Sequence, residues 1–253
     1  MMENRIAGSR VFLNQTEYQK IHNIKTGERC VMVLQDKAGC RYVLKLVKAQ
    51  CSEANRWREA YQISYEKLSG LTLTQERRRR GIRVPRVLAV YHRIDTDSGS
   101  ACGLLMEHID GRPLEKVLHD LTTAELLELL SAVIATVRYV NRHLGYYHMD
   151  ISPNNILIDR DGHAWLIDYE GAYRLYENNR WIVCSTAAAP TAAEPSVPDA
   201  HRCEWQQCRM LLNMLENRLE PSKAAALMEE CEAAESPLAK LHLFIRTFRA
   251  NLF

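Results

Sequence analysis

The stretch HMDISPNNILIDRDGHAWLIDYEG, residues 148–171, constrains the fold of this chain more than any other part of the sequence. Its segments NILID and AWLID are short and apolar, and the turn between them contains Asp and Gly, so they predict a β-hairpin. Polar side chains stand at fixed intervals in and around this hairpin, namely His148, Asp150, Asn155 and Asp168. The apolar residues between them would hold these groups on rigid strands.

A long helix is predicted directly before this stretch. Residues Thr122–Glu125 (TTAE) have the spacing of a capping box, in which a hydroxyl and a carboxylate each bind a free backbone N–H group. Apolar residues then recur at helical spacing until Gly145: Leu126, Leu127, Leu130, Val133, Ile134, Val137 and Val140. From Asp199 to the end the pattern is again helical, interrupted at Pro221 and Pro237.

The first part of the chain predicts a small antiparallel β-sheet. Short apolar or alternating segments indicate strands within residues 24–47, 84–94 and 101–109. A helical segment opens at Ser52, and the turn-rich sequence Asp110–Pro113 marks a boundary. We therefore expect a β-rich lobe with one regulatory helix over residues 1–110, and a mainly helical lobe over residues 111–253.

The composition is that of a globular protein without a strong charge bias. Of the 253 residues, 47% are hydrophobic, and 33 Lys and Arg against 31 Asp and Glu give no indication of nucleic-acid binding. The eight cysteines include no CxxC pair, which favours reduced thiols. Because the chain contains neither a signal-peptide pattern nor a long apolar run, a soluble cytoplasmic protein is expected.

The spacing His-x-Asp-x-x-x-x-Asn, with a further Asp thirteen residues later, resembles the catalytic and metal-binding motifs of the protein-kinase-like superfamily. The resemblance implies an ATP- and Mg²⁺-dependent phosphotransferase. Asp150 would accept or orient the proton of the acceptor hydroxyl, Asn155 and Asp168 would bind Mg²⁺, and His148 would brace the loop. The alternative is a set of ordinary loop residues, since Asp and Asn favour turns.

A lysine on a strand and a glutamate on the next helix complete this pattern. Lys45 ends the segment YVLK, where kinases place the Lys that contacts the nucleotide phosphates. Its ordinary alternative is a solvated Lys on an edge strand. Glu59 and Glu66 share one helix face, and either could pair with Lys45; Glu66 is preferred because it lies nearer the following strand. A surface salt bridge is the alternative for both.

The resemblance extends from about residue 24 to about residue 217 and implies an α+β, two-lobed, protein-kinase-like fold with ATP in the cleft. The adenine would lie against the segment Met106, Glu107, His108 and Ile109, with backbone contacts from Glu107 and His108. Gly27 would belong to the loop over the phosphates, where protein kinases usually have three glycines.

Several departures from the protein-kinase pattern bear on the acceptor. Asp168 is followed by Gly171, one place later than in Asp-Phe-Gly, and Ser152 stands where serine/threonine protein kinases generally carry Lys. These features look most like bacterial kinases of the lipopolysaccharide core, the heptose kinases in particular, with a glycan hydroxyl as acceptor. Two alternatives stay open: a eukaryotic-like serine/threonine protein kinase, secreted or not, and a pseudokinase scaffold.

Two further segments have both a functional and an ordinary interpretation. The four arginines 77–80 would suit an anionic surface, such as lipid phosphates at a membrane, but such a run is more often a solvated helix end. Residues 183–198 are rich in Ala, Pro and Ser and predict a flexible loop, whose hydroxyl residues are ordinary in that setting.

Overall fold

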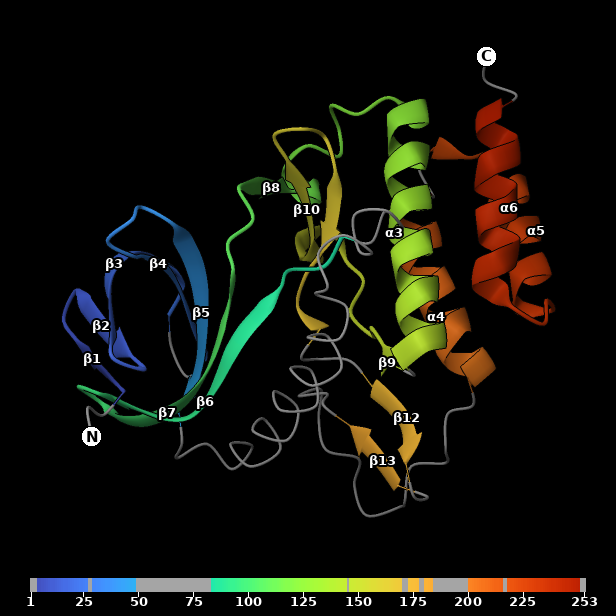
Figure 1. The fold of residues 1–253 in the computed structure, drawn as a ribbon. Coiled ribbons are helices and arrows are strands. Elements are labelled where there is room, and N and C mark those ends of the chain that lie inside the picture. Colours follow the sequence, from blue (N-terminus) through green and yellow to red (C-terminus); the bar gives the residue numbers. More distant parts are fainter. Residues whose placement is uncertain are drawn as a thin grey trace. The chain divides into compact units, whose positions relative to one another are not determined.

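The computed structural model describes residues 4–26, 29–48, 83–144, 146–169, 173–177, 180–183, 200–215 and 218–250. Their secondary structure is mixed, which confirms the predicted α+β class. The described residues form two compact units: residues 4–48 with 85–108, and residues 83–84 with 109–250 (Figure 1). Each unit is described by itself.

The first unit is a closed β-barrel of seven strands, and Figure 1 shows the sheet curving round on itself. The order around the barrel is β1-β2-β3-β4-β5-β7-β6, and all neighbouring pairs are antiparallel except the last, in which β1 runs parallel to β6 with Arg5 opposite Asp95. The strands are β1 (Arg5–Ala7), β2 (Arg10–Leu13), β3 (Thr16–Lys25), β4 (Arg29–Gln35), β5 (Arg41–Lys48), β6 (Val87–Thr96) and β7 (Gly99–Glu107).

Apolar side chains that alternate along the strands fill the barrel. Val11, Leu34, Leu44 and Ile94 are fully buried in one cluster. The turn between β4 and β5 forms because Asp36 accepts hydrogen bonds from the backbone N–H groups of two following residues, Ala38 and Cys40. The turn therefore sets the register of this strand pair.

The barrel is larger than the small antiparallel sheet that the sequence predicts. The additional strands are β1, β2 and most of β3, which the sequence analysis did not assign. Most residues of β3 are exposed and polar, so this strand lacks the apolar alternation that marks a half-buried strand. The parallel pairing of β1 with β6 joins residues about ninety positions apart and has no local signal.

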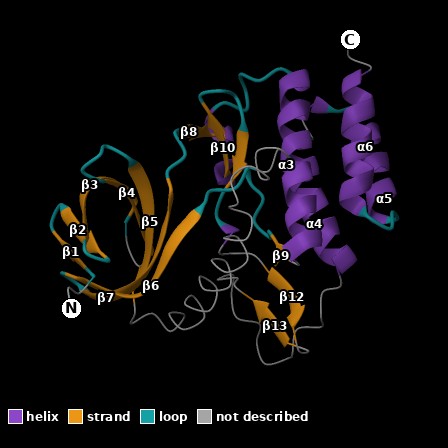
Figure 2. Cartoon of the chain, in the orientation of Figure 1, coloured by secondary structure: helices purple, strands orange, loops and turns teal. Residues whose placement is uncertain are grey.

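The second unit contains four described helices and two small sheets, and Figure 2 shows both kinds of element. The helices are α3 (Thr123–Leu144), α4 (Ala200–Asn213), α5 (Pro221–Glu232) and α6 (Pro237–Ala250), with short 3₁₀ helices η1 (Leu114–Lys116) and η2 (Pro153–Asn155). The sheets have the orders β11-β10-β8 and β13-β12-β9: β8 (Gly111–Pro113), β9 (Tyr146–Tyr147), β10 (Ile156–Asp159), β11 (Ala164–Leu166), β12 (Tyr173–Glu177) and β13 (Arg180–Val183).

Helix α3 begins at the predicted capping box. The backbone N–H of Thr122 donates to the carboxylate of Glu125 at 2.8 Å, and the N–H of Glu125 donates back to the Thr122 hydroxyl at 3.3 Å. The predicted apolar stripe from Leu126 to Val140 is buried, and the helix packs against α6, β9 and β11. The helix thereby forms a wall of the unit that carries the hairpin.

The C-terminal helices begin at the two prolines that interrupt the pattern. Pro221 and Pro237 are the first residues of α5 and α6, where the missing N–H of proline costs no hydrogen bond. Helix α6 packs against α3, α4 and α5. Among the described residues, six cysteines are free thiols and no helix combines the length and apolar composition needed to cross a bilayer.

Candidate functional site

The loop between β9 and β10 brings Asp150 and Asn155 into direct contact. The Asn155 side-chain nitrogen donates to the backbone carbonyl of Asp150 at 2.8 Å and to its carboxylate at 2.9 Å. The loop closes in η2, where the Asn155 N–H donates to the Ser152 carbonyl at 2.9 Å. The Asp150 side chain is exposed and held in a fixed position by a neighbour five residues away.

The side-chain oxygen of Asn155 can serve as a ligand for a cation. Its nitrogen is occupied by two bonds to Asp150, so its oxygen lies on the other branch of the amide, away from that carboxylate. An amide oxygen and a carboxylate are the hard donors that Mg²⁺ prefers. Asn155 and Asp168 therefore fit a magnesium site by the chemistry of their donor atoms.

His148 is buried and ties the loop to the end of β11. Its Nδ1 accepts a hydrogen bond from the Asp150 N–H at 3.2 Å, so the ring proton must lie on Nε2, which donates to the Ile167 carbonyl at 2.8 Å. One imidazole thus fixes the backbone before Asp150 and the backbone before Asp168. Its place in the site is that of a brace.

Asp168 follows β11 and has a left-handed backbone. The N–H of Ile167 donates to the Asn155 carbonyl at 2.9 Å, and Asp168 itself has φ of +70°. A non-glycine residue with this φ is uncommon, although Asp and Asn tolerate it better than most residues. Such strained positions gather at functional sites, where the surrounding bonds impose them.

The hairpin that carries Asp168 is shaped by Asp159. Its carboxylate accepts bonds from the N–H groups of Asp161 and His163, at 3.0 and 2.8 Å, and from the indole N–H of Trp165 at 2.8 Å. Burial would raise the pKa of Asp159, but the bonds from Trp165 and His163 outweigh it and lower the pKa. The turn is therefore built around an ionised carboxylate.

Tyr169 packs against the brace. Its ring meets the His148 ring edge-on, with centroids 4.6 Å apart and an angle of 79° between the planes. Tyr169 is almost fully buried, and burial raises the pKa of its phenol. This residue holds the position after Asp168 in the interior of the unit.

Helix α4 contacts the loop that carries Asp150 and supports it, and the sequence analysis did not identify this contact. Gln207 donates to the backbone carbonyl of His148 at 3.0 Å, and Asn141 of α3 donates to the Gln207 oxygen at 2.7 Å. The Ile151 N–H contacts the Met210 sulfur at 3.3 Å. The signal that could have revealed Asn141 is its place at helical spacing after Val137, where a buried polar residue needs a partner.

Lys45 lies in the first unit, in the middle of the barrel sheet. Strand β5 pairs with β4 on one side and β7 on the other, so Lys45 is not on an edge strand and that alternative is wrong. Leu44 and Leu46 are buried in the barrel, so the half-buried Lys45 projects from the opposite face of the strand.

The predicted adenine segment lies at the end of β7. Glu107 and Arg86 are joined by two bonds: the Glu107 N–H donates to the Arg86 carbonyl at 2.9 Å, and the Glu107 carboxylate accepts from the Arg86 N–H at 2.8 Å. The N–H of Glu107 is therefore already engaged within the barrel. Met106 and His108 flank it in the first unit, whereas Ile109 belongs to the second unit.

The structure thus brings together four of the predicted site residues, which all belong to the second unit: His148, Asp150, Asn155 and Asp168. Other predictions fall on residues outside the described ranges. They are Gly27, the helical segment that opens at Ser52, Glu59, Glu66, the arginines 77–80, Gly171 and residues 184–198 of the predicted loop 183–198, whose first residue instead ends β13.

A comparison with protein-family models matches residues 31–181 of the chain to the RIO domain. The chain belongs to the RIO-domain family. The matched range contains the whole loop and hairpin described above, together with Lys45 and the Met106–Ile109 segment. Membership in the protein-kinase-like superfamily, predicted from the His-x-Asp motif, is thereby confirmed.

The RIO-domain chain is also similar to curated serine/threonine-protein kinases. It is 28% identical over 130 residues to a probable serine/threonine-protein kinase of Streptomyces coelicolor. This alignment covers 49% of this chain and 19% of that protein. It is 26% identical over 183 residues to the serine/threonine-protein kinase greatwall of Mus musculus, or 71% and 19% of the two chains. It is 25% identical over 130 residues to PknB of Mycolicibacterium smegmatis, or 49% and 20%. The chain spans about a fifth of the length of these relatives.

Proposed function

We propose that this RIO-domain chain is an ATP- and Mg²⁺-dependent phosphotransferase that transfers the γ-phosphate to a hydroxyl group. The observation that carries the proposal is the bonded set of Asp150 and Asn155, tied through the Asn155 carbonyl and His148 to Ile167, the residue before Asp168. Phosphoryl transfer depends on positioning and charge stabilisation more than on covalent catalysis, and a rigid, polar loop of this kind suits that demand.

Each residue of the set has a distinct role in this proposal. Asp150 is exposed and fixed by Asn155, so it can orient the acceptor hydroxyl and accept its proton as the new bond to the γ-phosphorus forms and the bond from that phosphorus to the departing ADP breaks. Asn155 and Asp168 hold Mg²⁺ through their oxygens. When bound, Mg²⁺ would neutralise negative charge on the phosphate groups of ATP.

The nucleotide contacts in the proposal come from the predicted N-terminal lobe, residues 1–110. Lys45 binds phosphate oxygens, and the segment Met106–Ile109 contacts the adenine. Glu66, with Glu59 as the alternative, pairs with Lys45, and Gly27 belongs to the loop over the phosphates. The two lobes of the proposed kinase are residues 1–110 and 111–253.

The acceptor that we favour is a hydroxyl of a protein side chain, because the similar curated proteins are named serine/threonine-protein kinases. A sugar hydroxyl, as in the lipopolysaccharide core, is the second candidate. It rests on Ser152, which closes the turn of η2 at the position where protein kinases generally carry Lys.

Transfer from γ-labelled ATP tests the proposal, with protein and lipopolysaccharide-core acceptors offered in parallel. Asp150→Asn should lower the rate by about 10²- to 10⁴-fold, the range of a lost general base. Asp161→Asn removes the same charge from an exposed turn of the hairpin and should leave the rate unchanged. Nucleotide binding without Mg²⁺-dependent turnover on any acceptor would instead support the scaffold alternative.

A further inference from the structure

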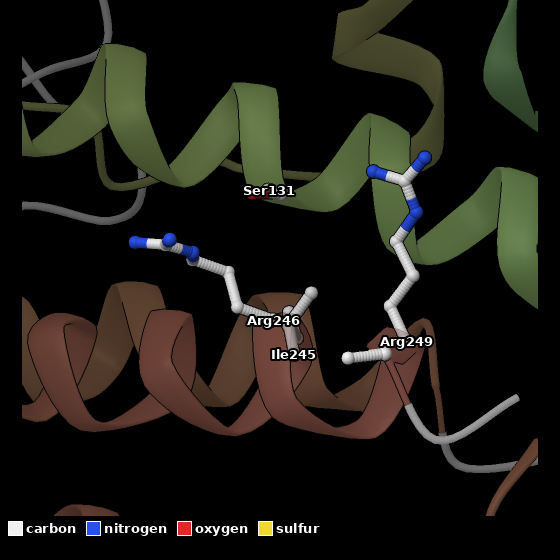
Figure 3. Close-up of a pocket in the computed structure, with 5 residues that line it drawn as sticks. Ser131, Ile245, Arg246 and Arg249 are labelled. Atoms are coloured by element: carbon white, nitrogen blue, oxygen red, sulfur yellow. The ribbon is translucent and has the colours of Figure 1, made fainter. Parts of the chain in front are cut away.

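A pocket of about 340 Å³ lies between α3 and α6, and no residue of the candidate active site lines it. Figure 3 shows Arg249 extending from α6 to α3 and Arg246 extending along the space between the two helices, with Ser131 of α3 between the two arginines. Ile245 and Ala250 complete the lining with apolar surface. We propose that this pocket binds a small phosphorylated compound, with Arg246, Arg249 and Ser131 holding its phosphate group.

Positive charge around this pocket exceeds the negative charge. Arg249 is paired with the Glu128 carboxylate at 2.8 Å. Arg246 has no ion-pair partner among the residues that the structure describes, and the half-buried Arg138 donates to a neutral imidazole, that of His242, at 3.5 Å. An anion in the pocket would offset this excess.

The pKa of His242 reports the same crowding of cations. Burial lowers the pKa of His242, and the charges of Arg138 and Arg246 lower it further. The pKa of Arg138 is itself lowered by burial and by Arg142, although Glu204 acts in the opposite direction. Arg138 and Arg246 therefore both lie close enough to His242 to oppose its protonation, and Arg142 lies close enough to Arg138 to act on that guanidinium.

Ser131 has a hydroxyl hydrogen directed by this network. Because His242 Nδ1 accepts from Arg138, its proton lies on Nε2 and is donated to the Ser131 oxygen at 2.9 Å. The Ser131 oxygen thus acts as an acceptor toward His242, which leaves its own hydrogen for an acceptor in the pocket. A hydroxyl donor flanked by two guanidiniums matches the several oxygens of a phosphate group.

The size and lining of the pocket indicate a small molecule as the ligand. Ligand pockets typically have volumes of about 300–1,000 Å³ with apolar walls and a few polar groups. The exposed Ala250 would contact the carbon skeleton of the compound while the phosphate meets the guanidiniums. A concave site between two helices suits a compact solute better than a flat membrane surface.

The proposal is tested on the full chain with glycerol 3-phosphate and pyrophosphate as probes, and with glycerol as the uncharged control. In ¹⁵N spectra, the side-chain Nε–H signals of Arg246 and Arg249 should shift on addition of either anion and stay in place with glycerol. Calorimetry should give a Kd that rises about tenfold in Arg246→Gln, which removes one charge-assisted contact. Ser131→Ala should weaken binding without changing the net charge.

Arg209→Gln is the matched control, because it removes one exposed arginine from α4 without touching the pocket lining. Its Kd should equal that of the unchanged protein, and Asp150→Asn should bind equally well. The proposal is overturned if the shifts occur only outside α3 and α6, if Arg209→Gln weakens binding as much as Arg246→Gln, or if only phosphatidic acid vesicles bind.

Discussion

Gln207 of α4 donates a hydrogen bond of 3.0 Å to the backbone carbonyl of His148, two residues before the proposed catalytic base. The same side chain exchanges hydrogen bonds with Asn141 of α3, and both amides are buried. A buried amide must be hydrogen-bonded to avoid a large desolvation cost, so the pair defines one position for the loop. Helices α3 and α4 thereby fix the position of the backbone that leads to Asp150.

Gln207→Leu should destabilise the protein and slow phosphoryl transfer. The variant leaves the His148 carbonyl and the Asn141 amide without their partner, which costs about 1–3 kcal/mol of unfolding free energy for a buried polar group. The expected kinetic effect falls on kcat, because Asp150 is displaced while the nucleotide contacts remain.

Urea unfolding and steady-state kinetics measure both effects, and Gln206→Leu is the control because Gln206 is exposed on the same helix. A double-mutant cycle with Asn141→Leu should give a coupling energy between the two sites. Additive losses would show that the two amides do not act as a pair.

His148→Phe should lower kcat while leaving ATP binding unchanged. The phenyl ring keeps the edge-on contact with Tyr169 but cannot bond the Asp150 N–H or the Ile167 carbonyl. The loop and the strand end then lose their common brace. His119→Phe, at an exposed position, serves as the control, and equal kcat values for the two variants would contradict the bracing role.

Two substitutions of Asp168 distinguish the effect of its backbone conformation on stability from its proposed role in metal binding. Asp168→Asn should be more stable than Asp168→Val, because Asn accepts the left-handed conformation at φ of +70°, yet it should lose Mg²⁺-dependent activity. Asp168→Val should lose stability as well, by about 1–2 kcal/mol for a residue forced into this region. Thermal unfolding of both variants provides the measurement, and equal melting temperatures would refute the strain argument.

His242 should make stability depend on pH. Its folded-state pKa lies below the ordinary value of 6.5, so as pH falls below that value the unfolded chain takes up a proton that the folded protein excludes. Stability should therefore decrease from about pH 7 to about pH 5. His242→Gln should flatten this decrease in urea unfolding, whereas the exposed His22→Gln should not; parallel curves for all three proteins would contradict it.

Gly111→Ala should disrupt the sheet that carries the hairpin. A Cβ atom at residue 111 would lie 2.7 Å from the Ile158 carbonyl oxygen, which belongs to the paired strand and cannot move aside like a side chain. Overpacking of this kind costs about 1–3 kcal/mol of unfolding free energy. Arg112→Ala, at the adjacent exposed residue, is the control in urea unfolding, and equal midpoints would show that β8 and β10 can separate freely.

The parts of the fold that the sequence predicts are those whose signals are local. Helix α3 has its cap and its apolar stripe within one continuous segment, and the β10–β11 hairpin has its turn residues between two apolar strands. The site motif lies in the same stretch. Its internal geometry follows from short-range bonds, such as the one from Asn155 to Asp150.

The parts that the sequence does not predict depend on pairing between distant residues. The strands β1 to β3 are short or polar, and the barrel closes only because β1 meets β6. The helical spacing of Asn141 after Val137 indicates a buried polar residue that needs a partner, but only the tertiary packing brings Gln207 to it and to the His148 carbonyl. No periodicity in either helix indicates that a loop carbonyl lies between them.

Closure of the barrel through β1 has a consequence for how the protein behaves in concentrated solution. Every strand of this sheet has a neighbouring strand on both sides. Next to the β1–β6 pair, the backbone N–H of Asp95 donates a hydrogen bond to the Asn4 carbonyl at 2.9 Å. Removing the three residues of β1 would uncover hydrogen-bonding groups on β2 and β6 at once. Strands of other copies could pair with these two exposed edge strands, so a shortened chain would be prone to aggregate.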